Sequence, residues 1–350
     1  MRSQPTVRLA SVATAFPAHK VSAGDTVESL ARLFPAEERG FLEELVARSG
    51  VRERRIALPL EETLVERSFT ERNAAWREVA LDLAHRAARS AIDRAGIDAA
   101  RIDDLIDVSC TGIAIPALDV DLAPALGLRP EVRRVPITES GCAAGALALS
   151  LAGDLVRGGR RVLIVAVELC SLTLVCGDVS RTNLVASLLF GDGAAAAVLG
   201  PDGAGPRLVA AGSHLLPDTR SMMGFEVGEH GLRIVLQREL PAVLAEHLRP
   251  AVDAFLARNG RVIGDVGLHL VHPGGRRILD AYAEIFALPA GALALSHESL
   301  TRHGNLSSAS ILAVLEAALE GGVRPPKGRL ALVLGVGPGL SLELSLWSWD

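Results

Sequence analysis

The sequence predicts an α/β fold, because short apolar strands and helices alternate along most of its 350 residues. Two runs of small and β-branched residues, 162–167 and 194–199, are typical of strands buried on both faces. Residues 201–206 are rich in glycine and proline and predict a linker, after which the strand and helix pattern begins again. We therefore divide the chain into two halves, residues 1–205 and 206–350.

Local patterns place the elements within each half. A first strand ends in a turn at Phe16-Pro17, and Gly96 ends a long helix with 3.6-residue periodicity. The turn at 191–193 leads into the second buried strand. In chain order, the predicted elements are strand 7–12, helices 76–95 and 146–155, strands 162–167 and 194–199, helix 238–259, strand 266–271, helices 277–287 and 307–319, and strands 330–334 and 341–347.

Composition excludes several classes of protein. A hydrophobic content of 49% with 22% charged residues is typical of a globular protein, and a net charge of −5 does not favour nucleic acid as a partner. No apolar run reaches the roughly 18 residues of a membrane-spanning helix. The apolar stretch 9–18 is short for a signal peptide and is better interpreted as part of the first strand. These patterns predict a cytoplasmic protein without a membrane partner.

The cysteines and histidines do not have the spacing of a metal site. The four cysteines at 110, 142, 170 and 176 form no CxxC pair and are expected to be free thiols in a reducing compartment. His269 and His272 stand three apart on a predicted strand, where side chains at that spacing point to opposite faces. We expect neither a metal nor a bound cofactor.

Three polar residues stand at the ends of buried elements. Cys142 lies among small residues at the start of an apolar helix, where free N–H groups favour a thiolate. His272 follows an apolar strand directly, and Asn305 precedes the helix 307–319. Taken singly, each has a structural alternative: a buried cysteine, a hydrogen-bonded histidine and a helix cap. Together they make a nucleophile, a base and an amide donor.

The segments that carry these residues resemble the type III polyketide synthases, the chalcone and stilbene synthase family. The most specific matches are His-Pro-Gly-Gly at 272–275 and Gly-Val-Gly-Pro-Gly-Leu at 335–340. Further matches are Gly-Cys-Ala-Ala-Gly at 141–145, Leu-Phe-Gly-Asp-Gly-Ala-Ala at 189–195 and Gly-Asn-Leu-Ser-Ser at 304–308. The resemblance covers nearly the whole chain. It implies a homodimeric, thiolase-like αβαβα layered fold with two pseudo-repeated halves.

The resemblance also implies a mechanism. Cys142 would take an acyl group from a CoA thioester. Its thiol would be activated by pairing with His272 as thiolate and imidazolium. Malonyl-CoA would then lose carbon dioxide, and the enolate would attack the Cys142 thioester. His272 and Asn305 would donate hydrogen bonds to the enolate oxygen. The implied partners are acyl-CoA and malonyl-CoA, and CoA thioesters are substrates here rather than cofactors.

Further positions match substrate-binding positions of the family. Phe190 corresponds to a phenylalanine between the CoA tunnel and the reaction cavity, and Ile234 falls near a second one. Cys110 and Cys170 stand where plant members carry threonine, and Ser307 belongs to the asparagine motif. A basic cluster lies where the family grips CoA phosphates, although a solvated charged surface is an equal alternative: Arg48, Arg52, Arg54 and Arg55.

The run Glu-Leu-Cys-Ser at 168–171 is similar to bacterial members that make alkylpyrones or tetrahydroxynaphthalene. We expect a fatty acyl-CoA starter and an alkylpyrone product, with malonyl-CoA priming and tetrahydroxynaphthalene as the alternative. A ketoacyl-ACP synthase III is the nearest rival class, since it shares the cysteine, histidine and asparagine. A papain-like hydrolase fits poorly with 3% aromatic residues and a cysteine in mid-chain. An inactive binding protein with this fold is the remaining alternative.

Overall fold

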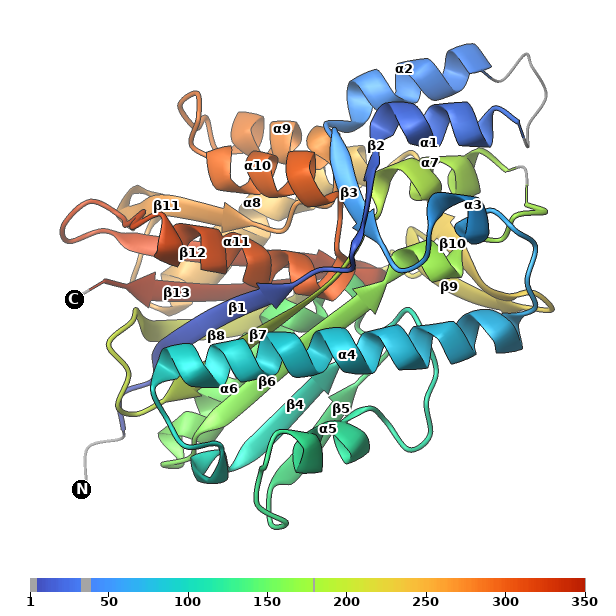
Figure 1. Ribbon diagram of the computed structural model, residues 1–350. Helices are drawn as coiled ribbons and strands as arrows, with labels where there is room; N and C mark the ends of the chain where they lie inside the picture. The colour runs from blue at the N-terminus through green and yellow to red at the C-terminus, as the bar shows by residue number, and fades with distance from the viewer. Residues whose placement is uncertain (1–4, 33–38, 179, 350) are drawn as a thin grey trace.

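The computed structural model describes residues 5–32, 39–178 and 180–349. The outer bounds of the two predicted halves, residues 1 and 350, lie outside the described residues. Within them, nine strands form one mixed sheet (Figure 1). From one edge to the other the strands are β11 (Val266–Val271), β12 (Leu330–Gly337), β13 (Ser341–Ser348), β8 (Arg207–Leu215), β1 (Arg8–Ala15), β7 (Asp192–Gly200), β6 (Val162–Leu169), β4 (Asp104–Val108) and β5 (Arg133–Ile137).

Two half-sheets meet between β1 and β8. Only Arg8 and Arg207 pair in register there, with backbone bonds from Leu9 N to the Pro206 carbonyl (3.0 Å) and from Leu208 N to the Val7 carbonyl (2.9 Å). One half-sheet is built from residues 8–200 and the other from 207–348. The intervening segment 201–206, predicted as a linker, consists of turns and bends between β7 and β8.

Side chains alternate between the two faces of each strand, so each half-sheet is covered by helices on both faces and the molecule has five layers. In β6, Ile164 belongs to a core cluster shared with helices α6 (Ala144–Arg157) and α11 (Ser310–Glu320), whereas Val165 packs with α4 (Phe69–Ala95). In β12, Val333 faces the same central helices, while Leu332 packs with α8 (Leu240–Arg258) and α9 (Arg276–Ile285).

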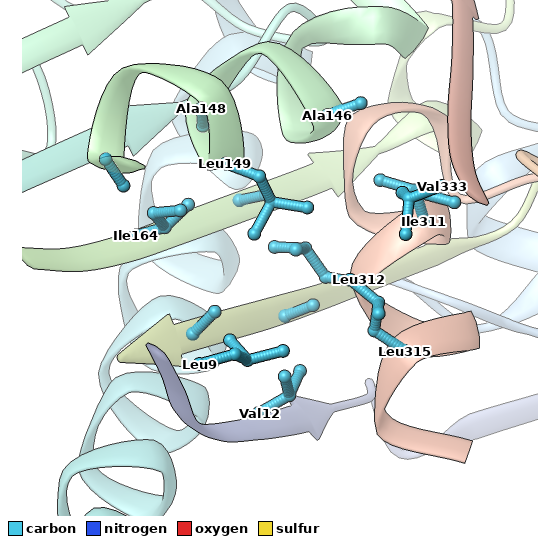
Figure 2. Packing of buried hydrophobic residues seen from close by; sticks show 14 of the residues in the cluster. Leu9, Val12, Ala146, Ala148, Leu149, Ile164, Ile311, Leu312, Leu315 and Val333 are labelled. Atoms are coloured by element: carbon cyan, nitrogen blue, oxygen red, sulfur yellow. The ribbon is translucent and has the colours of Figure 1, made fainter. Parts of the chain in front are cut away.

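Helices α6 and α11 therefore lie between the two half-sheets. Figure 2 shows Leu149 of α6 and Leu312 of α11 pointing toward one another in this shared core. Helices α4 and α5 (Asp119–Ala125) cover one outer face, and α8 and α9 cover the other. The αβαβα arrangement predicted from the family resemblance is confirmed.

The predicted elements are present, with shifted ends. Helix α4 begins at Phe69 rather than at residue 76, because Ser68 and Glu71 form a capping box. It ends at Gly96 as predicted, with φ at +64°. The predicted helix 307–319 starts as a 3₁₀ turn, Ser307–Ala309, before α11.

Several short elements were not predicted, because each has too few residues to establish a hydrophobic period. They are β2 (His19–Ser22), β3 (Glu53–Ile56), α1 (Ala23–Leu30), α2 (Arg39–Ser49), α3 (Leu60–Thr63), α7 (Arg181–Leu189), the hairpin β9 (Met223–Gly228) and β10 (Gly231–Leu236), and α10 (Ala294–His303), besides α5, β4, β5 and β8. In the described part of the chain, no helix is both long and apolar enough to cross a membrane.

Candidate active site

Cys142 lies in the 3₁₀ turn Gly141–Ala143, which leads directly into the N-terminus of α6. This turn packs against the glycine-rich end of β12. Gly141 has φ at +53°, and a Cβ on it would come within 2.6 Å of the Pro338 ring. A Cβ on Gly337 would come within 2.5 Å of the Ala143 Cβ. The two glycine motifs noted in the sequence are therefore needed at one place, because together they let the second half pack against the cysteine turn.

Asn305 and Ser307 connect to Cys142 from the segment before α11. The Asn305 Oδ1 accepts hydrogen bonds from Ser307 N (2.8 Å) and the Ser310 hydroxyl (3.3 Å). The Ser307 hydroxyl lies 3.5 Å from the Cys142 sulfur and 3.4 Å from the Cys110 sulfur. Ser307 has φ at +49°, an unusual conformation for a residue with a side chain. The Asn305 side chain thus accepts a hydrogen bond from the first N–H group of the 3₁₀ turn Ser307–Ala309.

His272 reaches the same region from the end of β11. Its backbone N–H donates to the Leu334 carbonyl (2.8 Å), and its side chain is 2% exposed. A Cβ on Gly274 would lie 3.6 Å from the His272 Nε2. The Asn305 Nδ2 donates to the Gly274 carbonyl at 3.4 Å. Gly274 is therefore the point at which the histidine ring and the asparagine amide approach one another.

Burial moves the pKa values of the proposed nucleophile and base apart. Burial raises the pKa of the Cys142 thiol to about 11, although the Ser307 hydroxyl lowers it in part. Burial lowers the pKa of His272 to about 4. Among the described residues, the His272 Nδ1 has no hydrogen-bond partner. These shifts favour a neutral thiol and a neutral imidazole, and they run against a preformed thiolate–imidazolium pair.

A cavity of about 1110 Å³ opens beside Cys142. Its lining includes most of the residues predicted to contact substrate, together with aliphatic side chains of β10. His272 and Asn305 do not appear among the described residues of this lining, so the cavity reaches the candidate site at Cys142 and Ser307. The predicted residues that line it are Cys110, Cys142, Cys170, Phe190, Ile234 and Ser307.

The basic cluster does not act as one group. Arg54 is buried and faces the protein interior. Arg48 is exposed on α2 and pairs with Glu44 (2.9 Å), and Arg55 donates to the Ala18 carbonyl (2.7 Å). Arg52 is exposed. Phosphate binding by the three outer arginines stays a prediction, whereas Arg54 is not available to a CoA phosphate in this structure.

Glu168 was not predicted as part of the site. It is fully buried at the end of β6 and accepts hydrogen bonds from the Ser308 and Thr111 hydroxyls and from Cys110 N (3.1 Å). Burial raises the pKa of this carboxyl group. A single acidic residue at the end of an otherwise apolar strand was the sequence signal that could have identified it. Its hydrogen bonds connect the Cys110 segment to the Ser308 segment.

Within the described residues, no group of three or more histidine, cysteine or acidic side chains is arranged to hold a metal ion. The site is instead a buried thiol, imidazole and amide beside a large cavity. Such a set can form a thioester, move a proton and stabilise an oxyanion.

Comparison with known proteins agrees with this chemistry. The N-terminal domain model of the chalcone and stilbene synthases matches residues 1–203, and the C-terminal domain model matches residues 207–348. A 1,3,6,8-tetrahydroxynaphthalene synthase of Streptomyces peucetius subsp. caesius is 42% identical over 97% of this chain and 93% of its own length. A more distant relative, an alpha-pyrone synthesis polyketide synthase-like protein of Mycobacterium tuberculosis, is 29% identical over 95% of this chain and 88% of its own.

A solved structure shows the same architecture. The crystal structure of 1,3,6,8-tetrahydroxynaphthalene synthase from Streptomyces coelicolor A3(2), a bacterial type III polyketide synthase, superposes with a TM-score of 0.93. It is 33% identical, and the match covers 98% of this chain and 99% of that one. The family models span both halves of the chain, and the fold and its motifs agree with them. The chain thus belongs to the chalcone and stilbene synthase family and is a type III polyketide synthase, a condensing enzyme that uses acyl-CoA substrates.

Proposed function

We propose that this enzyme primes itself with malonyl-CoA and extends it with further malonyl-CoA to 1,3,6,8-tetrahydroxynaphthalene. The observation that carries the proposal is the 42% identity, over 97% of the chain, to a tetrahydroxynaphthalene synthase. The carbon skeleton of that product is a multiple of the two-carbon malonate unit, so it requires no other starter. This reverses the order of the two products that the sequence motifs favoured.

The loading step uses Cys142 and His272. The Cys142 sulfur attacks the thioester carbonyl of the starter, and its proton moves to His272 as the S–C bond forms. The CoA sulfur leaves and takes that proton, which gives an acyl-enzyme and free CoA–SH. With both groups neutral at rest, His272 acts as a general base, and its pKa of about 4 is lower than the optimum for that role at neutral pH.

The extension step uses His272 and Asn305. When malonyl-CoA loses carbon dioxide, the electrons of the broken C–C bond form an enolate on the remaining acetyl-CoA unit. The enolate carbon attacks the Cys142 thioester and releases the Cys142 sulfur. The Asn305 amide gives one hydrogen to the Gly274 carbonyl and keeps a second for the enolate oxygen. Each such donor contributes about 3 kcal/mol to transition-state stabilisation.

An alkylpyrone is the second candidate product, as the sequence motifs predict. The cavity of about 1110 Å³ has an aliphatic wall that includes Ile113, Leu232, Ile234 and Val235. An acyl chain buried against such a wall gains about 0.8 kcal/mol per methylene. The 29% identical alpha-pyrone relative adds support for this candidate.

Product analysis with defined substrates distinguishes the two candidates. The purified enzyme is incubated with isotopically labelled malonyl-CoA, alone and with a dodecanoyl-CoA competitor, and the products are weighed by mass spectrometry. We expect tetrahydroxynaphthalene from malonyl-CoA alone, with a yield that the competitor barely changes. Cys142→Ala is the control and should give no product. A pyrone that retains the unlabelled dodecanoyl carbons would establish the second candidate, and no condensation product from either mixture would overturn both.

A further inference from the structure

A fully buried arginine lies behind the cavity wall, at Arg54 of β3. Its side chain is 6% exposed. The Nη1 donates to the Phe190 carbonyl at 2.9 Å, and the Nη2 donates to the Thr26 hydroxyl of α1 at 3.2 Å. Burial lowers the pKa of Arg54 to about 10, so the guanidinium stays charged at neutral pH. The guanidinium of Arg54 therefore connects β3 to α1 and to Phe190, which lines the cavity.

The Phe190 carbonyl belongs to a segment that also holds Asn305. Gly191 N donates to the Asn305 carbonyl (3.0 Å), and Asn305 N donates to the Leu189 carbonyl (2.9 Å). These two bonds flank Phe190 and pair it with Asn305 as a parallel bridge. Arg54 binds the carbonyl between them. The segment 189–191 is thus held by Asn305 and by Arg54.

Close packing leaves this segment little freedom. A Cβ on Gly191 would lie 2.1 Å from the His303 carbonyl oxygen and 3.3 Å from the Arg54 Cβ. A Cβ on Gly304 would lie 2.7 Å from the Leu189 carbonyl oxygen. A shift of the Phe190 backbone would therefore reach the asparagine segment directly.

The acceptors of Arg54 are unusual for a buried charge. Both are neutral oxygens, and no carboxylate is hydrogen-bonded to the guanidinium among the described residues. Asp192, an acidic group that attracts Arg54, is fully buried. It accepts hydrogen bonds from Ala57 N (2.7 Å), Ser171 N (2.8 Å) and the Ser171 hydroxyl. Burying a charge to bind a carbonyl and a hydroxyl is poorly explained by stability alone, since an apolar side chain would avoid the desolvation cost.

We propose that Arg54 is a positioning residue for the condensation, which fixes Phe190 at the cavity wall and, through the backbone of residues 189–191, the Asn305 amide. The proposal rests on the function proposed above and deepens it, because it assigns a role to a residue that is not among the described lining residues of the cavity beside Cys142. Arg54 acts through hydrogen bonds to the backbone and leaves the nucleophile untouched.

The test compares Arg54→Met, Arg54→Lys and Thr26→Val in the full-length enzyme. Thr26→Val is the matched control, because it removes one acceptor of Arg54 and leaves the Phe190 bond in place. The measured quantities are kcat and KM for malonyl-CoA decarboxylation, the rate of Cys142 alkylation by iodoacetamide, and Tm. Arg54→Met should lower kcat at least about tenfold, since a displacement of about 1 Å at a reacting group can cost about a hundredfold.

Arg54→Lys should recover part of that loss, because an ammonium group can still donate to the Phe190 carbonyl but cannot reproduce the fork. Thr26→Val should keep kcat near the wild-type value, even if its Tm falls as far as that of Arg54→Lys. Cys142 alkylation should be unchanged in all three. If Arg54→Met does not fold, the kcat of Arg54→Lys is compared with that of Thr26→Val to test the positioning role of Arg54.

The inference is overturned if Arg54→Lys and Thr26→Val lose kcat equally, or if Arg54→Met retains wild-type kcat, because Arg54 would then only support the fold. An inactive wild-type enzyme is a different outcome. It would overturn the proposed function, and this inference with it. An active wild type with an unaffected Arg54→Met overturns the inference alone.

Discussion

At the residue scale, Cys142 and His272 are the proposed nucleophile and base, and both are buried. Because burial raises the thiol pKa to about 11 and lowers the imidazole pKa to about 4, both groups are neutral between those values. The thiolate fraction then grows as pH rises toward 11. The ion pair that the family resemblance implies has the opposite signature, since an imidazolium partner keeps the thiolate present well below neutral pH.

Alkylation of Cys142 by iodoacetamide measures which state is present. For the neutral pair, we expect the rate to rise about tenfold per pH unit between pH 6 and 10, because only the thiolate reacts. Peptide mass spectrometry separates Cys142 from the three other cysteines, and Cys142→Ala supplies the blank. A fast rate that is constant from pH 6 to 8, and that is lost in His272→Gln, would show the ion pair instead.

At the element scale, the contact between α6 and the 3₁₀ turn before α11 depends on Gly145. A Cβ there would lie 2.1 Å from the Ser308 carbonyl oxygen, next to the Ser307 hydroxyl that contacts Cys142. Gly145→Ala should therefore lower the free energy of unfolding by about 1–3 kcal/mol and reduce activity as well. Urea unfolding and the product assay measure the two effects.

Gly40→Ala in α2 is the matched control for this substitution. Gly40 is exposed, and no atom of the described residues lies within 4 Å of a Cβ built on it. Alanine there should raise the free energy of unfolding by about 0.4–1 kcal/mol, because it reduces the conformational entropy of the unfolded chain. Equal effects of the two substitutions on stability would contradict the close packing of α6 against the Ser308 segment.

At the scale of the whole molecule, one core joins the two halves. Leu312 of α11 is fully buried in the cluster that includes residues of both half-sheets (Figure 2). Leu312→Ala should lower the free energy of unfolding by about 2–5 kcal/mol because it leaves a cavity there. Leu151→Ala, at a 36% exposed position of α6, is the control and should have a small effect. Urea unfolding followed by two probes, one in each half, should give coincident transitions, and separate transitions would contradict a shared core. A homodimer of this molecule stays a prediction.

Sequence patterns were sufficient to predict the fold class and the segments that form the candidate site. Cys142, His272 and Asn305 were predicted because each stands at the end of a buried element, and such ends are marked by local residues: glycines, a proline and apolar runs. The family motifs then placed Phe190 and Ile234, and both line the cavity. Local patterns predict these features because their causes lie within a few residues along the chain.

The difference in burial between the four arginines is visible only in the folded structure. Arg48, Arg52, Arg54 and Arg55 have equivalent settings in the sequence, yet only Arg54 is buried, where it binds the Phe190 carbonyl across 136 residues of chain. Its burial depends on the pairing of β3 with β2 and on the packing of α1, which a short charged strand does not encode by its own period. The pKa shifts of Cys142 and His272 have the same origin. The helix start and the strand end can be recognised from local sequence, but the burial that shifts both pKa values comes from segments far apart in the chain.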